Sequence, residues 1–316
     1  MIGDGQTAAR ARGTDAAQLD ELWQRLLASA PVEPLVDRAL AEDLGDRGDI
    51  TSNLLVEADR FGEASLRARE SITLAGVKLV GLAAKRHDPG VSVRNTACDG
   101  MVVAGGGEAA RLEGPLRSIL AVERTLLNFV SHLSGIATLT ARYVDAVAGT
   151  GAAILDTRKT LPGYRALAKY AVRCGGGRSH RLGLHDAVLV KDNHVAHIAA
   201  GDLGRRVAEA VAEARRGREA PTFVEVEVDG LDQLDAVLDA GPDIVLLDNM
   251  GPELVGEAVC RRNQRAPGVL LEASGGVDLA SARAIAEAGV DRIAIGALTH
   301  SAPAADLGLD IEPTGG

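Results

Sequence analysis

The second half of the chain alternates apolar segments with amphipathic ones. Beyond Gly151, six runs rich in Val, Ile, Leu and Ala are each followed by a stretch with helical periodicity. Runs that are apolar at successive positions indicate strands buried on both faces, as in a parallel sheet covered by helices. No GxGxxG motif follows the first run, so an α/β barrel is favoured over an open, doubly wound sheet. The predicted strands are residues 152–157, 186–192, 222–228, 243–249, 268–274 and 292–297.

The first half of the chain has a different pattern. Periodicity predicts two helices, over about residues 15–29 and 33–42. Residues 62–70 and 108–114 alternate small or apolar positions with charged ones, which is typical of strands with one exposed face. We therefore predict a small domain of helices and strands in front of the barrel.

A long helix is predicted between these two regions. It begins at Pro115, a favourable first-turn residue, ends near Gly149 and is interrupted at Ser134-Gly135. Its sequence is apolar on nearly all sides, so we expect it to be buried. Arg124 lies within this apolar run, and a buried guanidinium is costly unless a partner neutralises it. The partner is either an acid, such as Glu123, or an anionic ligand.

Composition and charge exclude several classes of protein. The net charge of −10 argues against a nucleic-acid or anionic-membrane surface over the whole protein. Cys98, Cys174 and Cys260 lack metal-ligand spacing, which favours three reduced, buried thiols in a cytoplasmic protein. No apolar run is long enough for a membrane span. Residues 1–18 lack the apolar core of a secretory signal, and we expect them to form a disordered lead-in.

The predicted strand ends carry a local excess of basic residues. The segment from Asp156 to His194 contains eight bases and three acids, within a protein that is acidic overall. In α/β barrels the carboxyl ends of the strands form the ligand site, and clustered positive charge attracts anions there. The bases that flank strand ends or glycine turns are favoured as ligand contacts; they are Arg158, Lys159, Arg181 and Lys191.

Two glycine turns follow the last predicted strands. Ser274, Gly275 and Gly276 end one strand, and Gly296 ends the next. Barrels frequently hold a phosphate at this position on backbone N–H groups, and glycine permits the close approach of the anion. We therefore predict a phosphate site at these turns.

Two acids end neighbouring strands beside this predicted phosphate site. Glu227 and Asp248 would face bound phosphates, and acids so placed usually act through Mg²⁺. The alternative is that they pair with nearby Arg or Lys. Glu225 shares the strand face of Glu227, so the pattern leaves it as a second candidate.

These motifs together resemble the quinolinate phosphoribosyltransferase family. The resemblance rests on ERTLLNFVSHLSGIAT, DTRKT, GGGRSHRLGLHD, VLVKDNH, VEVEV, DIVLLDNM, LEASGG and DRIAIGAL, and it runs from about Pro34 to Leu309. It implies an α/β fold with an N-terminal α/β sandwich domain and a C-terminal seven-stranded α/β barrel, one strand more than the pattern predicts. The implied domains are residues 19–134, with 298–316 returning to them, and residues 135–297.

The resemblance also assigns roles to individual residues. The family's basic quinolinate pocket maps onto Arg124, Arg158, Lys159, His180, Arg181 and Lys191. The acids near the ribose and Mg²⁺ map onto Glu227 and Asp248. The phosphate turns map onto Ser274, Gly275, Gly276 and Gly296. Family members are homodimers, and Arg124 would cross the interface to the partner's site.

The implied reaction transfers phosphoribosyl from phosphoribosyl pyrophosphate to quinolinate with decarboxylation, which gives nicotinate mononucleotide. Either Lys191 or His180 would supply the proton that replaces CO₂. Three alternatives stay open: a relative that acts on another pyridine base, a lyase with Lys191 as a Schiff base, and a non-catalytic anion-binding protein.

Overall fold

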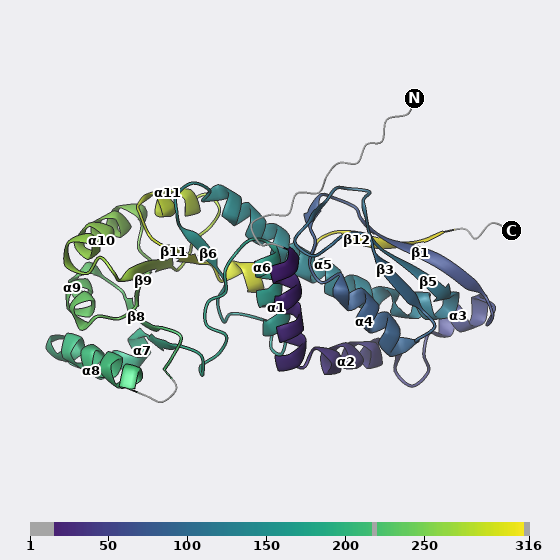
Figure 1. Cartoon of the computed structure of the whole chain (residues 1–316), viewed down its shortest axis with the longest axis horizontal. Helices are drawn as coiled ribbons and strands as arrows, with labels where there is room; N and C mark the ends of the chain where they lie inside the picture. The colour runs from purple at the N-terminus through teal and green to yellow at the C-terminus, as the bar shows by residue number, and fades with distance from the viewer. Residues whose placement is uncertain (1–15, 217–219, 313–316) are drawn as a thin grey trace, which may run out of the picture. The chain divides into compact units, whose positions relative to one another are not determined.

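The computed structural model describes residues 16–216 and 220–312 of the 316-residue chain. It forms two compact units, each described here by itself (Figure 1). The first comprises residues 16–141, Thr160–Gly176 and the chain from Leu298 onward; the second comprises Arg142–Lys159 and Gly177–Ala297. The predicted lead-in falls mostly on residues 1–15, outside the described residues.

The first unit contains a four-stranded antiparallel sheet in the order β12-β1-β5-β3. One face of β1, with Ala64, Leu66 and Ala68, packs on the core, while the opposite face carries the half-exposed Arg67 and the buried Ser65. The predicted strands 62–70 and 108–114 are confirmed as β1 and β5. The strand bounds are β1 Phe61–Ala68, β3 Ser92–Asn95, β5 Glu108–Pro115 and β12 Leu307–Glu312; β2 Ile72–Thr73 and β4 Val102–Val103 form a separate pair.

Helices cover this sheet and extend the unit. The predicted helices 15–29 and 33–42 are confirmed as α1 (Ala16–Ser29) and α2 (Val32–Leu44). The remaining helices of this unit, besides α5, are α3 Ile50–Leu55, α4 Lys78–His87 and α6 Arg165–Cys174. The Trp23 ring of α1 packs against Tyr170 of α6 with centroids 5.1 Å apart. Helix α6 follows the first barrel strand in sequence yet packs within the N-terminal unit.

The long helix α5 (Leu116–Ala146) is continuous, so the predicted interruption at Ser134-Gly135 is wrong. Packing explains the two small residues instead. The Ser134 hydroxyl accepts the backbone N–H of Ala75 at 3.1 Å. A Cβ at Gly135 would collide with the carbonyl oxygen of Pro303, so glycine allows two backbones to approach.

The second unit is built on a six-stranded parallel sheet in the order β6-β11-β10-β9-β8-β7. All six strands predicted from apolar runs are confirmed. A seventh segment is reduced to one parallel bridge, between Arg178 and Leu155 beside β6. The fold is therefore a barrel-like α/β domain. The strand bounds are β6 Ala153–Leu155, β7 Val188–Val190, β8 Val224–Val228, β9 Ile244–Asp248, β10 Leu270–Ser274 and β11 Arg292–Ala294.

Amphipathic helices line the outside of this sheet (Figure 1). Successive helices from α8 to α11 contact one another, which leaves the carboxyl ends of the strands for ligand binding. Among the described residues, no helix is long and apolar enough to cross a membrane. The helix bounds are α7 Asp192–Val195, α8 Leu203–Arg216, α9 Leu231–Ala240, α10 Pro252–Arg265, α11 Ala282–Glu287 and α12 Ala297–His300, with a 3₁₀ turn at Ala200–Asp202.

Candidate functional site

Three carboxylates meet at the carboxyl ends of β8 and β9. Glu227, Asp229 and Asp248 have oxygens within 4.8 Å of one another. Lys191, which follows β7, forms an ion pair with Glu227 through Nζ. The carboxyl ends of the parallel strands form the rim of the barrel. The structure thus brings together at this rim three residues that the sequence placed there: Lys191, Glu227 and Asp248. A group of hard oxygen ligands is a donor set that Mg²⁺ prefers.

The turn after β9 connects these acids to the predicted phosphate site. Asn249 has a φ of 55° and is the one non-glycine residue in the left-handed region among the described residues. Its Nδ2 donates to Asp248 Oδ2 at 2.7 Å, and its backbone N–H donates to the Ser274 carbonyl at 2.9 Å. Any Cβ at Gly275, where φ is 88°, would collide with the Asn249 side chain. Glycine is therefore required there.

The other predicted turn residues lie beside this one. Gly276 has a φ of 62° and nothing near the position of a Cβ, so its backbone is open to a ligand. Gly296 follows β11, the strand that pairs with β10. The two glycine turns therefore come from adjacent parallel strands, as a phosphate site at this rim requires.

Two arginines of the same rim have spare hydrogen-bonding capacity. Arg181 is 7% exposed, and its pKa is lowered first by burial and then by the charge of Arg158. The Nε of Arg158 is buried and has no hydrogen-bond partner among the described residues. Two guanidinium groups that repel each other and retain free donors suit a bound anion, above all a carboxylate. Lys159 follows Arg158 with an exposed side chain.

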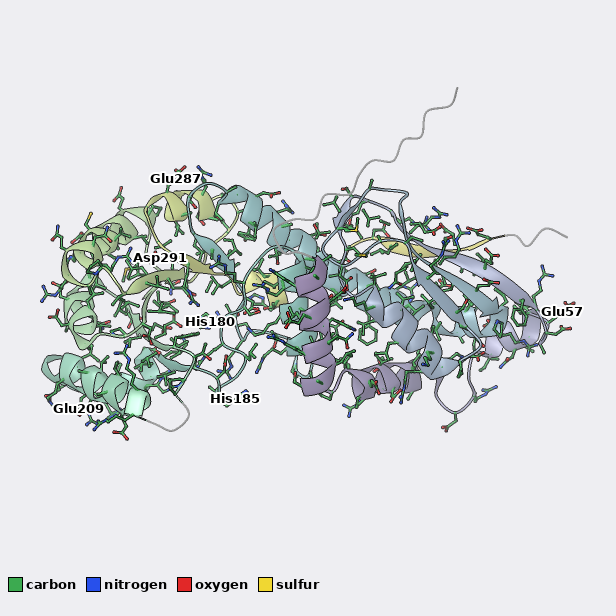
Figure 2. The ribbon with its side chains drawn as sticks, in the orientation of Figure 1. Glu57, His180, His185, Glu209, Glu287 and Asp291 are labelled. Carbon is green, nitrogen blue, oxygen red and sulfur yellow. The ribbon has the colours of Figure 1, made fainter. Side chains whose placement is uncertain are left out.

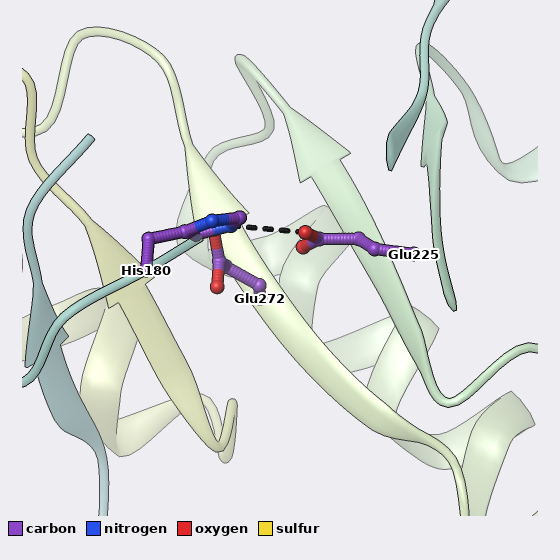
Figure 3. Close-up of side chains that lie close together, drawn as sticks. All are labelled: His180, Glu225 and Glu272. Carbon is purple, nitrogen blue, oxygen red and sulfur yellow. Dashed lines mark ion pairs between the residues drawn. The ribbon is translucent and has the colours of Figure 1, made fainter. Parts of the chain in front are cut away.

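A second group lies one layer below the rim, where His180 faces two buried glutamates (Figure 3). The His180 Nε2 atom is 2.9 Å from Glu225 Oε2 and 3.2 Å from Glu272 Oε1. Both carboxyl side chains have no exposed surface. Burial and the neighbouring Glu272 raise the pKa of Glu225, which the His180 ring opposes. Figure 2 shows His180 inside this unit, whereas Glu209 and Glu287 lie on its outer helices.

The His180 ring is held at both nitrogens. Burial lowers its pKa, but the ion pairs with Glu225 and Glu272 outweigh burial and raise the pKa to about 9. Nδ1 accepts the backbone N–H of Arg181 at 2.7 Å, which opposes a second proton on the ring. A pKa of about 9 favours protons on both nitrogens, whereas an Nδ1 that accepts an N–H cannot carry one. The two findings disagree on Nδ1 and agree on a proton at Nε2, between the carboxylates. The backbone N–H of His180 donates to the buried Asp156 at 2.8 Å.

Arg124 corrects a prediction from the sequence. Its side chain on α5 is exposed, and among the described residues it has no ion pair, with Glu123 or any other acid. Asn128, one turn later, is also exposed and lines a cavity of about 340 Å³ in the first unit, together with Phe129 and Tyr164. The helix is therefore not buried on all sides, because one stripe of α5 faces outward.

The cysteines correct a second prediction. Cys174 is buried, but Cys98 and Cys260 are exposed. All three are free thiols. The expectation of three buried thiols is therefore wrong for two of them, because Cys98 lies in a mostly exposed segment after β3 and Cys260 on an exposed position of α10.

The sequence reasoning overlooked several residues of the site. Asp229 continues the every-second-residue spacing of Glu225 and Glu227, so strand parity could have identified it. Glu272 is a lone acid in the apolar run LLEAS, and an acid within a buried strand is a signal that could have identified it. No sequence signal marks Asn249 beyond the tolerance of Asn for left-handed backbone.

Comparisons with known proteins point to one family for the whole chain. The C-terminal domain of quinolinate phosphoribosyl transferase matches residues 136–310, and the N-terminal domain matches residues 49–134. A nicotinate-nucleotide pyrophosphorylase (carboxylating) of Mycobacterium leprae is 47% identical over 278 residues, which are 87% of this chain and 95% of the relative. A probable enzyme of the same name from Synechocystis is 40% identical over 280 residues, 89% of this chain and 92% of the relative.

Solved structures give the same result. The nicotinate-nucleotide pyrophosphorylase of Francisella tularensis is similar with a TM-score of 0.80 at 39% identity, covering 89% of this chain and 96% of that one. The enzyme of Ehrlichia chaffeensis has a TM-score of 0.81 at 35% identity, covering 90% of this chain and 100% of that one. Domain matches, sequence identity and fold all agree, and this chain therefore belongs to the quinolinate phosphoribosyltransferase family.

Proposed function

We propose that this protein transfers the phosphoribosyl group of phosphoribosyl pyrophosphate to quinolinate and releases CO₂. The products are nicotinate mononucleotide and pyrophosphate. One observation carries the proposal: the same rim holds two arginines with spare donors, a group of three carboxylates and two glycine turns. These are the groups needed for a dicarboxylate, a metal-bound pyrophosphate and a phosphate.

Quinolinate is a pyridine with two adjacent carboxylates, and the basic residues of the rim would bind it. Arg158 and Arg181 repel each other in the free protein, and two carboxylates between them would turn that repulsion into paired hydrogen bonds. Lys159, His180 and Lys191 surround this pair in the family's pattern. A substrate that supplies both negative charges therefore fits the pocket best.

The sugar phosphate would bind on the other side of the rim. Ser274, Gly275, Gly276 and Gly296 offer backbone N–H groups to the 5′-phosphate. Glu227 and Asp248, with Asp229 beside them, would hold Mg²⁺ directly or through water. The bound ion would stabilise the negative charge of the departing pyrophosphate.

The chain's own residues would then guide the transfer. With the carboxylates of quinolinate held by the arginines, the ring nitrogen attacks the anomeric carbon as the bond between that carbon and pyrophosphate breaks. The carboxylates of Glu227 and Asp248 face the positive charge that develops on the ribose ring. The cationic ring nitrogen then stabilises the carbanion left when CO₂ departs, and one proton is added to that carbon. Lys191 Nζ is the donor better placed at the rim, because both nitrogens of His180 are engaged below it.

We further propose that the active form is a homodimer in which Arg124 serves the partner's barrel. The support is that Arg124 is exposed on α5 and has no partner within the described residues of its own chain. Such an unpaired arginine suits an anion supplied by a second subunit. We also propose a cytoplasmic location, which three free thiols fit.

The test is direct synthesis. Purified protein with Mg²⁺, quinolinate and phosphoribosyl pyrophosphate is expected to release CO₂ and pyrophosphate in equal amounts with nicotinate mononucleotide. Folded protein that yields none of the three would contradict the proposal. Replacing quinolinate by other pyridine acids tests a relative with another substrate, and borohydride trapping on Lys191 tests a Schiff-base lyase. That lyase needs a neutral amine, whereas Nζ is ion-paired to Glu227.

A further inference from the structure

The group beneath the rim is arranged as a second layer of the barrel interior. Glu225 lies two residues before Glu227 on β8, and Glu272 lies two residues before Ser274 on β10. Residues two apart on a strand point to the same face, about 6–7 Å from each other along the strand. The two buried acids therefore lie directly below two rim residues.

Glu272 is held on both sides. One oxygen, Oε1, is 3.2 Å from His180 Nε2, and the other, Oε2, accepts a hydrogen bond from Arg292 Nε at 2.7 Å. Glu272 has no exposed surface, and the Arg292 side chain is 16% exposed. A charge-assisted bond from Arg to a fully buried carboxylate fixes the orientation of that carboxylate.

Arg292 is fixed in turn by an aromatic ring. Its guanidinium carbon lies 5.4 Å from the centroid of Phe223, a distance at which a cation over a ring face is stabilised. The same ring also contacts the His180 imidazole, edge-on, with centroids 5.4 Å apart. Arg292, Phe223, Glu272 and His180 thus form one closed group of contacts.

The group reaches the substrate rim through His180. The Nδ1 atom of its ring accepts the backbone N–H of Arg181 at 2.7 Å. This bond fixes the backbone from which the Arg181 side chain extends to the pocket. A tilt of the imidazole would break this bond and move Arg181. Within the described residues, the Arg181 side chain itself makes one hydrogen bond, a long one from Nη1 to the Ala187 carbonyl at 3.3 Å.

We propose that Glu272 and Arg292 are positioning residues for quinolinate: Arg292 orients Glu272, and Glu272 with Glu225 holds the His180 ring so that Arg181 faces the substrate. The proposal rests on the proposed function and adds two residues to its site. Neither residue touches the substrate. Their role is to keep a proton on Nε2 and to keep the ring plane fixed, as carboxylates do for histidines that ligate metals.

The first experiment measures the kinetic constants of Glu272→Gln for quinolinate and for phosphoribosyl pyrophosphate. The substitution keeps the shape and removes the charge. We expect kcat/KM for quinolinate to fall roughly 10–100-fold, the range of such outer contacts at metal sites, while KM for phosphoribosyl pyrophosphate stays nearly constant. Arg292→Met is expected to give a smaller loss in the same direction, and Arg292→Lys to restore part of it. An unchanged kcat/KM in folded Glu272→Gln, or equal effects on both substrates, would overturn the proposal.

A matched control separates positioning from general damage. Arg262 is a buried arginine of the same unit that pairs with Asp291, the residue before Arg292, at 2.8 Å and with the Val269 carbonyl at 2.6 Å. Arg262→Met therefore also removes a buried arginine–acid pair. It is expected to lower the melting temperature and leave KM for quinolinate unchanged. A quinolinate defect in this control equal to that of Arg292→Met would count against the proposal.

Two further measurements test whether the effect passes through His180. In a His180→Ala background, Glu272→Gln is expected to change kcat/KM for quinolinate by no more than about twofold, because the connecting ring is gone. A full, additive loss there would contradict the proposal. In ¹⁵N-histidine-labelled protein, Glu272→Gln is expected to shift the nitrogen signals of one imidazole, assigned through His180→Ala. This readout needs no turnover, so an inactive wild type would refute the proposed function alone, whereas unshifted signals would refute the positioning role.

Discussion

Charged side chains occupy opposite environments in the two units. On the N-terminal sheet, Arg67 contacts Glu108 at 3.2 Å and Glu312 at 3.8 Å, with a third of its side chain exposed. In the barrel, His180 and Glu225 are almost fully buried at a similar spacing. The residue types overlap, but water screens the first group and not the second.

The comparison separates two uses of charge. Exposed ion pairs contribute about 0–1 kcal/mol each, so the sheet network can vary at little cost. A buried ion pair gains little over an apolar pair of the same size, but removing one partner costs about 3–5 kcal/mol. The barrel cluster is therefore a poor device for stability and a good one for fixing groups below a binding rim.

The largest effect is expected at the proposed subunit interface. Arg124→Ala and Lys191→Ala should each be nearly inactive, because each would remove a base of the proposed substrate pocket. Mixed and allowed to exchange, they should regain activity, since a heterodimer holds one site free of both changes. Product formation by the mixture is the measurement. A dead mixture, with exchange verified by mass, would mean that Arg124 acts within its own chain.

Breaking the buried cluster should destabilise the barrel. Glu225→Ala leaves His180 without its nearer carboxylate and should lower the free energy of unfolding by about 3–5 kcal/mol. Denaturant unfolding of the two proteins measures the difference. A loss below about 1 kcal/mol would mean that this buried cluster contributes no more to stability than exposed ion pairs do, and the two units would not differ in this respect.

A buried acid in the first unit extends the comparison to pH. Asp99 is buried and accepts hydrogen bonds from the Val77 N–H and the Tyr170 hydroxyl; burial raises its pKa to about 6. The folded state then binds a proton that the unfolded state has already lost. This contribution is full below about pH 4 and disappears as the pH rises to about 6, a change of about 3 kcal/mol.

Asp99→Asn should remove that pH dependence. The free energy of unfolding, measured from pH 4 to 7, should fall in the wild type relative to the variant as the pH rises. Parallel curves for the two proteins would show that Asp99 titrates normally despite its burial.

The smallest effect is expected on the exposed sheet. Arg67→Ala breaks contacts with Glu108, Asp310 and Glu312, yet the free energy of unfolding should change by about 1 kcal/mol or less. Activity should be unchanged, and added salt should shrink the difference further. A salt-insensitive loss of several kcal/mol would show that this network is effectively buried.

The sequence predicted the barrel strands because short, continuous apolar runs indicate strands that are buried on both faces. It also placed Glu227, Asp248 and Lys191 at one rim, because parallel strands end on the same side. It wrongly predicted a helix break at Ser134 and Gly135. Small residues occur both at helix breaks and where two backbones pack closely, and here they serve close packing. It failed on the burial of Arg124, because the apolar residues around Arg124 and Asn128 in the sequence outnumber the polar residues of the exposed stripe of α5. Glu272 was overlooked because its contacts with His180 and Arg292 depend on register across separate strands.

Substrate choice tests the central claim, that the basic pocket binds both carboxylates of quinolinate. Nicotinate lacks the carboxylate beside the ring nitrogen and would leave Arg158 or Arg181 unpaired. Breaking a buried pair costs roughly 3–5 kcal/mol, and solvent in the open cleft reduces this cost.

The decisive measurement is kcat/KM for quinolinate against nicotinate in the wild-type protein. The account predicts a preference of at least about a hundredfold, or about 2.7 kcal/mol, that narrows in Arg158→Ala and Arg181→Ala. Equal use of the two acids would contradict it, because the basic cluster would then serve the phosphates and not the second carboxylate.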